Sequence, residues 1–197
     1  MAPIEQEDGE RESRLRGPAE ILWAVTGLYQ GKRDAERYVR DDLSWGDFMG
    51  CTTSKEQTDR YVFGFLFSKV FSSGIATNMR IVSDEPWNGE DKEDARLRKV
   101  LQTSRVRIDT PALQGKPFDR CDLVLFHLRL FFKPSIARWW GIPASIEVPP
   151  AVFVFTQEGR IVHMEERLNV GSMLMKPNPY TPLRKRWCQL CIRLSRS

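Results

Sequence analysis

Apolar residues in the first half of the chain recur with the spacing of helices. In residues 18–29 they fall every three or four positions, which is typical of one buried helical face. Ser54 with Gln57 three residues later forms a capping-box pattern, and we expect the apolar helix that it begins to stop at Ser73-Gly74. The two faces consist of Ile21, Leu22, Val25, Leu28 and Tyr29, and of Tyr61, Val62, Phe65, Leu66 and Val70.

Between and after these helices the pattern changes. Residues 34–40 are predicted as a further short helix, and residues 43–48 as a short strand because apolar and polar positions alternate there. The same alternation predicts strands over residues 78–82 and 100–108, separated by a charged loop over 86–94.

The clearest strands lie in the last third of the chain. Alternation over residues 122–132 places Phe126 and His127 on opposite faces of one strand. Residues 151–155 and 160–168 follow, and the Gln157-Glu158-Gly159 segment that joins them is typical of a hairpin turn. Helices first and an antiparallel meander afterwards indicate an α+β fold rather than a parallel sheet.

This order of elements resembles the cone-shaped fold of the nuclear transport factor two-like (SnoaL-like) superfamily, in which three N-terminal helices pack on a curved antiparallel sheet. The resemblance covers roughly residues 18–175 and is most specific in the closing hairpin, residues 153–169. Residues 169–174 are similar to an uncharacterised plant and animal branch of SnoaL-like proteins. The chain departs from that branch at Met164, where a His is usual, and at Leu168, where a Trp is usual.

The resemblance implies a cavity at the wide end of the cone, where enzymes of the superfamily place an Asp, His or Tyr. Acid–base work by a carboxyl group there requires an apolar pocket that disfavours its charged form. Strand alternation places Glu166 among apolar neighbours, so Glu166 is the candidate acid or base, with an ion pair at the mouth of the cone as the alternative. Its candidate catalytic partners are Asp47 and Tyr61, and the expected cavity lining is Trp45, Phe65, Val162, Met164 and Leu168.

Composition fits one packed domain. Of 197 residues, 41% are hydrophobic, and no apolar run is long enough to cross a membrane. The acid-rich start resembles neither a secretory signal nor a transit peptide, and four cysteines are few for a disulfide scaffold, so we expect an intracellular, cytoplasmic protein. Two histidines, a lone pair of cysteines at 188 and 191 and no phosphate-binding Gly pattern predict neither a metal nor a cofactor.

The net charge of +4 is unevenly distributed. Residues 1–16 hold five acids and three bases and are expected to form a flexible arm before a domain over 17–175. Residues 184–197 hold five bases and no acid, so the rest of the chain sums to −1, which argues against specific nucleic-acid binding. We expect residues 176–197 to form a basic amphipathic tail for an anionic membrane surface or an acidic protein, or else a solvated tail. Its candidate contacts are Arg184, Lys185, Arg186, Trp187 and Arg193.

Trp139 and Trp140 are adjacent tryptophans in a segment bounded by Pro and Gly. They would cover the cavity, enter a membrane interface, contact a partner or pack on the domain. The expected function is a non-catalytic binding or scaffolding module, whose cone holds a small hydrophobic ligand or is plugged by its own aromatic side chains. The alternative is a cofactor-independent isomerase, dehydratase or cyclase that uses a buried carboxylate. A homodimer through the sheet and peripheral membrane association are further expectations.

Overall fold

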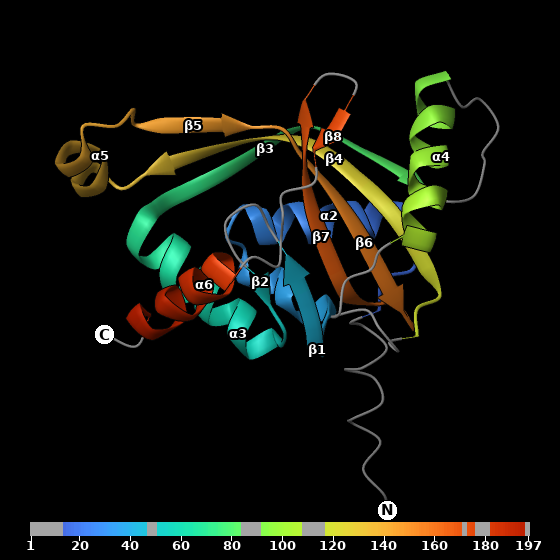
Figure 1. Cartoon of the computed structure of the whole chain (residues 1–197), viewed down its shortest axis with the longest axis horizontal. Helices are drawn as coiled ribbons and strands as arrows, with labels where there is room; N and C mark the ends of the chain where they lie inside the picture. The colour runs from blue at the N-terminus through green and yellow to red at the C-terminus, as the bar shows by residue number, and fades with distance from the viewer. Residues whose placement is uncertain are drawn as a thin grey trace, which may run out of the picture.

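Eight strands in the described part of the chain form one curved sheet (Figure 1). The computed structural model describes residues 14–46, 51–83, 92–107, 117–170, 173–175 and 182–195. The strands follow the order β2-β1-β7-β6-β4-β3, while β5 pairs with β4 and β8 with β7. Their bounds are β1 (Val39–Gly46), β2 (Cys51–Thr52), β3 (Phe71–Ser83), β4 (Arg120–Phe132), β5 (Ser145–Val148), β6 (Pro150–Gln157), β7 (Arg160–Val170) and β8 (Met173–Met175).

In the described part of the chain, three helical segments precede the long strands, as the sequence predicted, and three more helices follow β3, β4 and β8. Ser54 caps the third segment by accepting a 3.2 Å hydrogen bond from the backbone N–H of Gln57. Among the described residues, no helix is long and apolar enough to cross a membrane. The segments are α2 (Pro18–Tyr29), the 3₁₀ helix η1 (Arg33–Tyr38), α3 (Lys55–Asp59) running into the π-helix η2 (Arg60–Val70), α4 (Lys92–Arg107), α5 (Pro134–Trp140) and α6 (Pro182–Leu194).

Both faces of the sheet are covered. The face toward α2, here called the inner face, packs with α2, β1, η2 and α6 in one core cluster, to which β4 contributes Val124, Phe126 and Leu128. The opposite, outer face packs with α4 in a second cluster, to which β4 contributes Leu123 and Leu125. The predicted alternation along β4 is therefore confirmed, and so is the α+β class.

The closing hairpin is also confirmed. Strands β6 and β7 pair antiparallel and turn at Glu158-Gly159, whose φ angles of 52° and 75° suit Gly at the second position. On its other edge β7 pairs in parallel with β1, which brings Ser44 beside His163 and Trp45 beside Met164. This pairing places the first strand of the chain next to the last long one.

The predicted strand over residues 100–108 is wrong, because α4 occupies residues 92–107. Leu97 and Leu101 are four positions apart and both lie buried against the outer face, which is helical spacing. The Lys, Glu, Arg and Ala residues in the N-terminal half of α4 also favour a helix. The second apolar helix likewise ends earlier than expected, at Val70, and β3 begins at Phe71.

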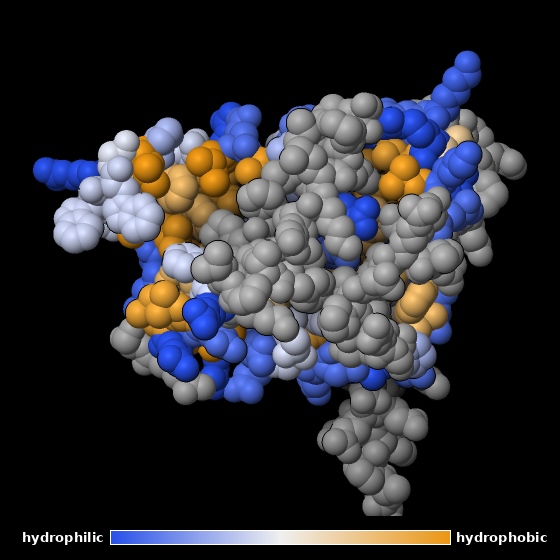
Figure 2. All heavy atoms as spheres, viewed as in Figure 1, coloured by the Kyte–Doolittle hydropathy of each residue, from blue (hydrophilic) through white to orange (hydrophobic). Residues whose placement is uncertain are grey.

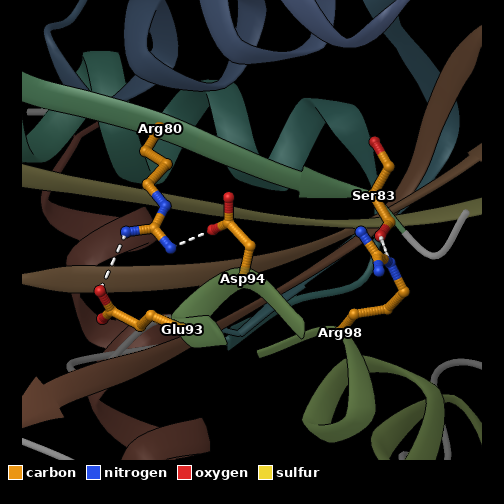
Figure 3. Close-up of polar contacts among 5 residues, drawn as sticks. All are labelled: Arg80, Ser83, Glu93, Asp94 and Arg98. Carbon is orange, nitrogen blue, oxygen red and sulfur yellow. Dashed lines mark hydrogen bonds and ion pairs between the residues drawn. The ribbon is translucent and has the colours of Figure 1, made fainter. Parts of the chain in front are cut away.

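Polar contacts hold α4 on β3 (Figure 3). Arg80 of β3 forms ion pairs with Glu93, at 3.3 Å, and with Asp94. Burial lowers the pKa of Arg80, but the hydrogen bonds to Asp94 and Glu93 outweigh that effect and raise it overall. Arg98, only 7% exposed, donates a 3.1 Å hydrogen bond to the backbone oxygen of Ser83. These contacts position the start of α4 over the outer cluster.

Candidate functional site

A buried hydrogen bond joins α2 to β7 on the inner face. The hydroxyl of Tyr29 donates to Oε2 of Glu166 at 2.8 Å, and the two residues are 8% and 7% exposed. Glu166, the carboxylate singled out from the sequence, therefore lies on the inner face with Met164. A phenol within hydrogen-bond reach of a buried carboxyl group is a pair with which a protein can hold or move a proton.

Aromatic rings surround this pair. The ring of Tyr29 lies edge-on to Trp45, with centroids 5.3 Å apart, and to Phe126, with centroids 5.2 Å apart. Trp45 and Phe126 are themselves 4% and 2% exposed. Among the described residues, Nε1 of Trp45 has no hydrogen-bond partner. The carboxylate of Glu166 thus sits at the edge of a packed aromatic cluster rather than in a solvated cleft.

Local sequence explains how Tyr29 reaches Glu166. Tyr29 is the last residue of α2, on the apolar face that the periodicity predicted. Gly74 of β3 lies directly against this helix end, because a Cβ atom at Gly74 would be 2.8 Å from the backbone oxygen of Tyr29. The missing side chain therefore lets the end of α2 approach the sheet closely.

Val162 does not line the inner face, and that sequence prediction is wrong. The register between β6 and β7 shifts between the pairs Phe155–His163 and Thr156–Ile161, which leaves Val162 as an extra residue on β7. Such a β-bulge interrupts the alternation of side chains. As a result Ile161 and Met164 pack in the inner cluster, whereas Val162 packs in the outer one.

The outer side of β7 carries a second set of buried polar groups. His163 is 1% exposed, and its Nδ1 lies 2.7 Å from the hydroxyl of Ser44. Glu165 pairs with Arg167 at 3.1 Å, and the guanidinium of Arg167 lies 4.4 Å from the centroid of the Phe153 ring. The ion pair between Glu165 and Arg167 brings two opposite charges together next to the outer cluster and so favours a structural role for these two residues.

The remaining residues that the sequence suggested for the site do not lie together. Tyr61 and Met164 are 1% and 0% exposed members of the inner cluster. Phe65 instead faces α6, where its ring lies edge-on to Trp187 with centroids 6.4 Å apart. Asp47 and the side chain of Leu168 lie outside the described residues.

The tail forms α6 and packs on the domain. Cys188 and Cys191 are 2% and 0% exposed and belong to the inner cluster, so this pair is part of the core. Arg186 and Arg193 are exposed, and the side chains of Arg184 and Lys185 lie outside the described part of the chain. No group of three or more His, Cys, Asp or Glu side chains is placed to hold a metal ion in the residues that the structure describes.

A groove of about 640 Å³ lies where α6 meets β2, α3 and η2. Of the candidates from the sequence, only Arg193 lines it, and Glu166 does not. Its lining consists of Cys51, Thr53, Ser54, Glu56, Gln57, Arg60, Cys188, Gln189, Ile192 and Arg193. The groove is therefore not the cavity around Glu166 that the resemblance implied.

Comparison with known proteins gives a likeness in fold. No protein-family model matches the sequence, and no protein with a curated description does. A "putative polyketide cyclase" from Silicibacter is similar over 83% of this chain and 90% of its own, with 13% identity and a TM-score of 0.44. A phenazine biosynthesis-related protein from Pseudomonas aeruginosa is similar over 83% of this chain and 84% of its own, with 11% identity and a TM-score of 0.45.

An NTF2-like protein of unknown function from Burkholderia pseudomallei is similar over 76% of this chain and 91% of its own, with 12% identity and a TM-score of 0.38. At these identities and TM-scores, the three structures assign no site residue to this chain. The roles of Tyr29 and Glu166 rest on its own geometry.

Proposed function

We propose that this protein is a non-catalytic binding module whose cone is filled by its own side chains. The observation that carries the proposal is the hydrogen bond between Tyr29 and Glu166, closed off by the rings of Trp45 and Phe126. An enzyme would present a hydroxyl and a carboxyl group of this kind to its substrate. Here the two groups bond to each other inside the core. A ligand or partner would therefore bind on the outside of the domain.

The packing of the inner face supports this proposal. Side chains from β4, β6 and β7 on this face, such as Phe126, Val154 and Met164, are buried in one cluster with residues of α2 and η2. An enzyme of the cone type needs room for a substrate beside its acid–base group. In this protein Tyr29 lies beside Glu166, and the rings of Trp45 and Phe126 pack against Tyr29.

One observation favours the alternative, an isomerase, dehydratase or cyclase that needs no cofactor. Glu166 is buried next to a phenol, and the buried indole N–H of Trp45 has no hydrogen-bond partner among the described residues. If the ring of Tyr29 rotated aside, a substrate would have access to the carboxyl group of Glu166. In that case Glu166 would transfer the proton, and Tyr29 would donate a hydrogen bond to the developing oxyanion.

Ligand-dependent stability separates the two functions. We expect the thermal midpoint of the native protein to be unchanged by benzene or by larger apolar ligands, because in this proposal the cone is filled by its own side chains. Phe126→Ala should create an apolar cavity, and benzene should then raise the midpoint of this variant. Leu128→Ala is a second variant with a smaller loss of packing. A rise in the native protein itself would show a hollow cone and overturn the proposal.

Glu166→Gln provides the matched test of the carboxylate. The glutamine oxygen can accept the hydrogen bond from Tyr29, so we expect nearly unchanged thermal stability. A large gain in stability would reveal a strained buried carboxylate, which is a property of catalytic sites. That result would favour the enzyme.

A further inference from the structure

Helices α5 and α6 are far apart in the sequence but lie at one end of the molecule (Figure 1). The C-terminal half of η2, residues 64–70, connects them. On one side the backbone N–H of Lys133, which precedes α5, donates a 2.9 Å hydrogen bond to the oxygen of Val70. On the other side α6 packs along η2 through the rings of Phe65 and Trp187. We call the surface of residues 64–70, 133–140 and 182–194 the basic-aromatic end.

Large apolar side chains of this end are exposed. Trp139 and Trp140 of α5 are 89% and 66% exposed, so they neither pack on the domain nor cover the cone. Trp187, Leu190 and Leu194 of α6 are 41%, 47% and 44% exposed, although Cys188 and Cys191, which lie beside them on the same helix, are buried. Figure 2 shows pale and orange side chains beside blue ones at the end where Figure 1 places α5 and α6.

Within the three segments of this end the charge has one sign, although Glu56 of α3 lines the groove beside α6 together with Arg193. The three segments contain seven basic residues and no acidic one, so the rest of the chain sums to −3 against the total of +4. The sequence alone assigned the excess of positive charge to the tail. In the structure α6 packs on η2, and Lys133 is hydrogen-bonded to the end of η2, so the bases of η2 and of the α5 segment lie at the same end as those of the tail. The seven are Lys69, Lys133, Arg138, Arg184, Lys185, Arg186 and Arg193.

We propose that the basic-aromatic end docks the protein on an anionic lipid membrane. Trp and Leu side chains surrounded by Lys and Arg suit the boundary between lipid headgroups and acyl chains, where rings and apolar tips insert and cations meet anionic headgroups. The core contacts of Cys188 and Cys191 hold α6 in helical form before it binds. A polyanion such as nucleic acid would use the charges but leaves the tryptophan pair without an apolar environment.

Vesicle co-sedimentation tests this docking. The full chain should sediment with phosphatidylcholine vesicles that contain phosphatidylserine and remain soluble with pure phosphatidylcholine. Trp139→Ala with Trp140→Ala should lower the partition coefficient about tenfold, because the inserted apolar area is lost. Arg138→Gln with Arg186→Gln should lower it about thirtyfold at low salt, and added salt should weaken the native binding in the same direction.

Matched controls lie elsewhere on the molecule. Trp23→Ala removes another exposed tryptophan, on α2, and Lys92→Gln with Lys99→Gln removes two cations from α4, which Figure 1 places at the opposite end. Both should bind vesicles like the native protein. So should Glu166→Gln, because the docking surface does not depend on whether the cone is filled or catalytic.

Three results would overturn the proposal. They are equal binding to neutral and anionic vesicles, native binding by the Trp139→Ala, Trp140→Ala variant, and loss of binding in the controls as well. Fluorescence of the tryptophans gives an independent measure, because insertion into the bilayer should shift their emission to shorter wavelength. Binding of duplex DNA by a chain that ignores anionic vesicles would assign this end to a polyanion and not to a membrane.

Discussion

The hydroxyl of Tyr29 donates a 2.8 Å hydrogen bond to Glu166, which lies 137 positions further along the chain. The bond ties the end of α2 to β7 across the inner face. A buried carboxylate is costly unless it is hydrogen-bonded, so this contact is one reason why the core tolerates Glu166. The first prediction follows from it.

Tyr29→Phe removes the donor but keeps the ring and its contacts with Trp45 and Phe126. We expect the free energy of unfolding to fall by about 1.5–3 kcal/mol, the range for hydrogen bonds to charged groups. Urea denaturation measures this difference. Tyr38→Phe is the control, since Tyr38 is only half-buried and packs through its ring on Trp23. Equal stability of the two variants would show that the bond to Glu166 contributes nothing.

The four cysteines should differ in their reaction with a thiol reagent. Cys121, Cys188 and Cys191 are buried, whereas Cys51 is half-buried at the groove, and none of the four is in a disulfide. Buried thiols react only when the structure opens, so one thiol per chain should react fast and three should react slowly. Absorbance with Ellman's reagent follows both phases. Cys51→Ser should abolish the fast phase, and a fast phase that remained in that variant would contradict the burial of Cys121, Cys188 and Cys191.

Glu36 should make stability depend on pH in mild acid. Burial raises its pKa above the ordinary value of 4.5, and the nearby Asp59 raises it further, although Arg33 and Lys55 oppose the change. Between 4.5 and the raised value, the folded state holds a proton that the unfolded state has lost. The contribution of Glu36 to stability therefore falls as the pH rises through this window, and the ionised group remains destabilising at neutral pH.

Glu36→Gln should accordingly raise stability at neutral pH and flatten the stability profile in that window. Urea denaturation over a series of mildly acidic and neutral buffers measures the effect. Asp34→Asn, an exposed acid on the same 3₁₀ helix, is the matched control. A loss of stability in Glu36→Gln at neutral pH would show instead that its contact with Arg33 outweighs the cost of burial.

The ion pair between Arg80 and Asp94 should stabilise the docking of α4 on β3. Asp94 has a side chain that is only 13% exposed, so its interaction is less screened than that of a surface pair. A double-mutant cycle with Arg80→Gln and Asp94→Asn should give a coupling of about 1 kcal/mol, at the upper end for such pairs. The same cycle at Arg129 and Glu147, whose side chains are 55% and 61% exposed, should give less. Equal couplings would show that burial of Asp94 adds nothing.

Patterns that act locally predicted the structure well. The alternation along β4, the turn at Glu158-Gly159 and the cap at Ser54 each depend on residues a few positions apart, and all three are confirmed. The helix α4 was missed because the alternating half of its sequence was weighed without its N-terminal half. Leu97 and Leu101 would have given the helical spacing if the two halves had been taken together.

The candidate site was predictable only in part. Strand alternation correctly placed Glu166 with Met164 on one face, but the bulge moved Val162 to the other, and no sequence pattern marked that bulge. Tyr29 was recognised as part of an apolar helical face and not as the partner of Glu166. That contact depends on how α2 crosses the sheet, which the close approach at Gly74 sets and the sequence alone does not reveal.

The burial of Cys188 and Cys191 has a consequence for biosynthesis. The inner cluster includes side chains from α6, so its packing stays incomplete until residues 182–194 have left the ribosome. Helices and hairpins that emerge earlier can form while synthesis continues, but they expose apolar surface until α6 arrives. Nascent chains halted before residue 182 should therefore be the form that requires a chaperone.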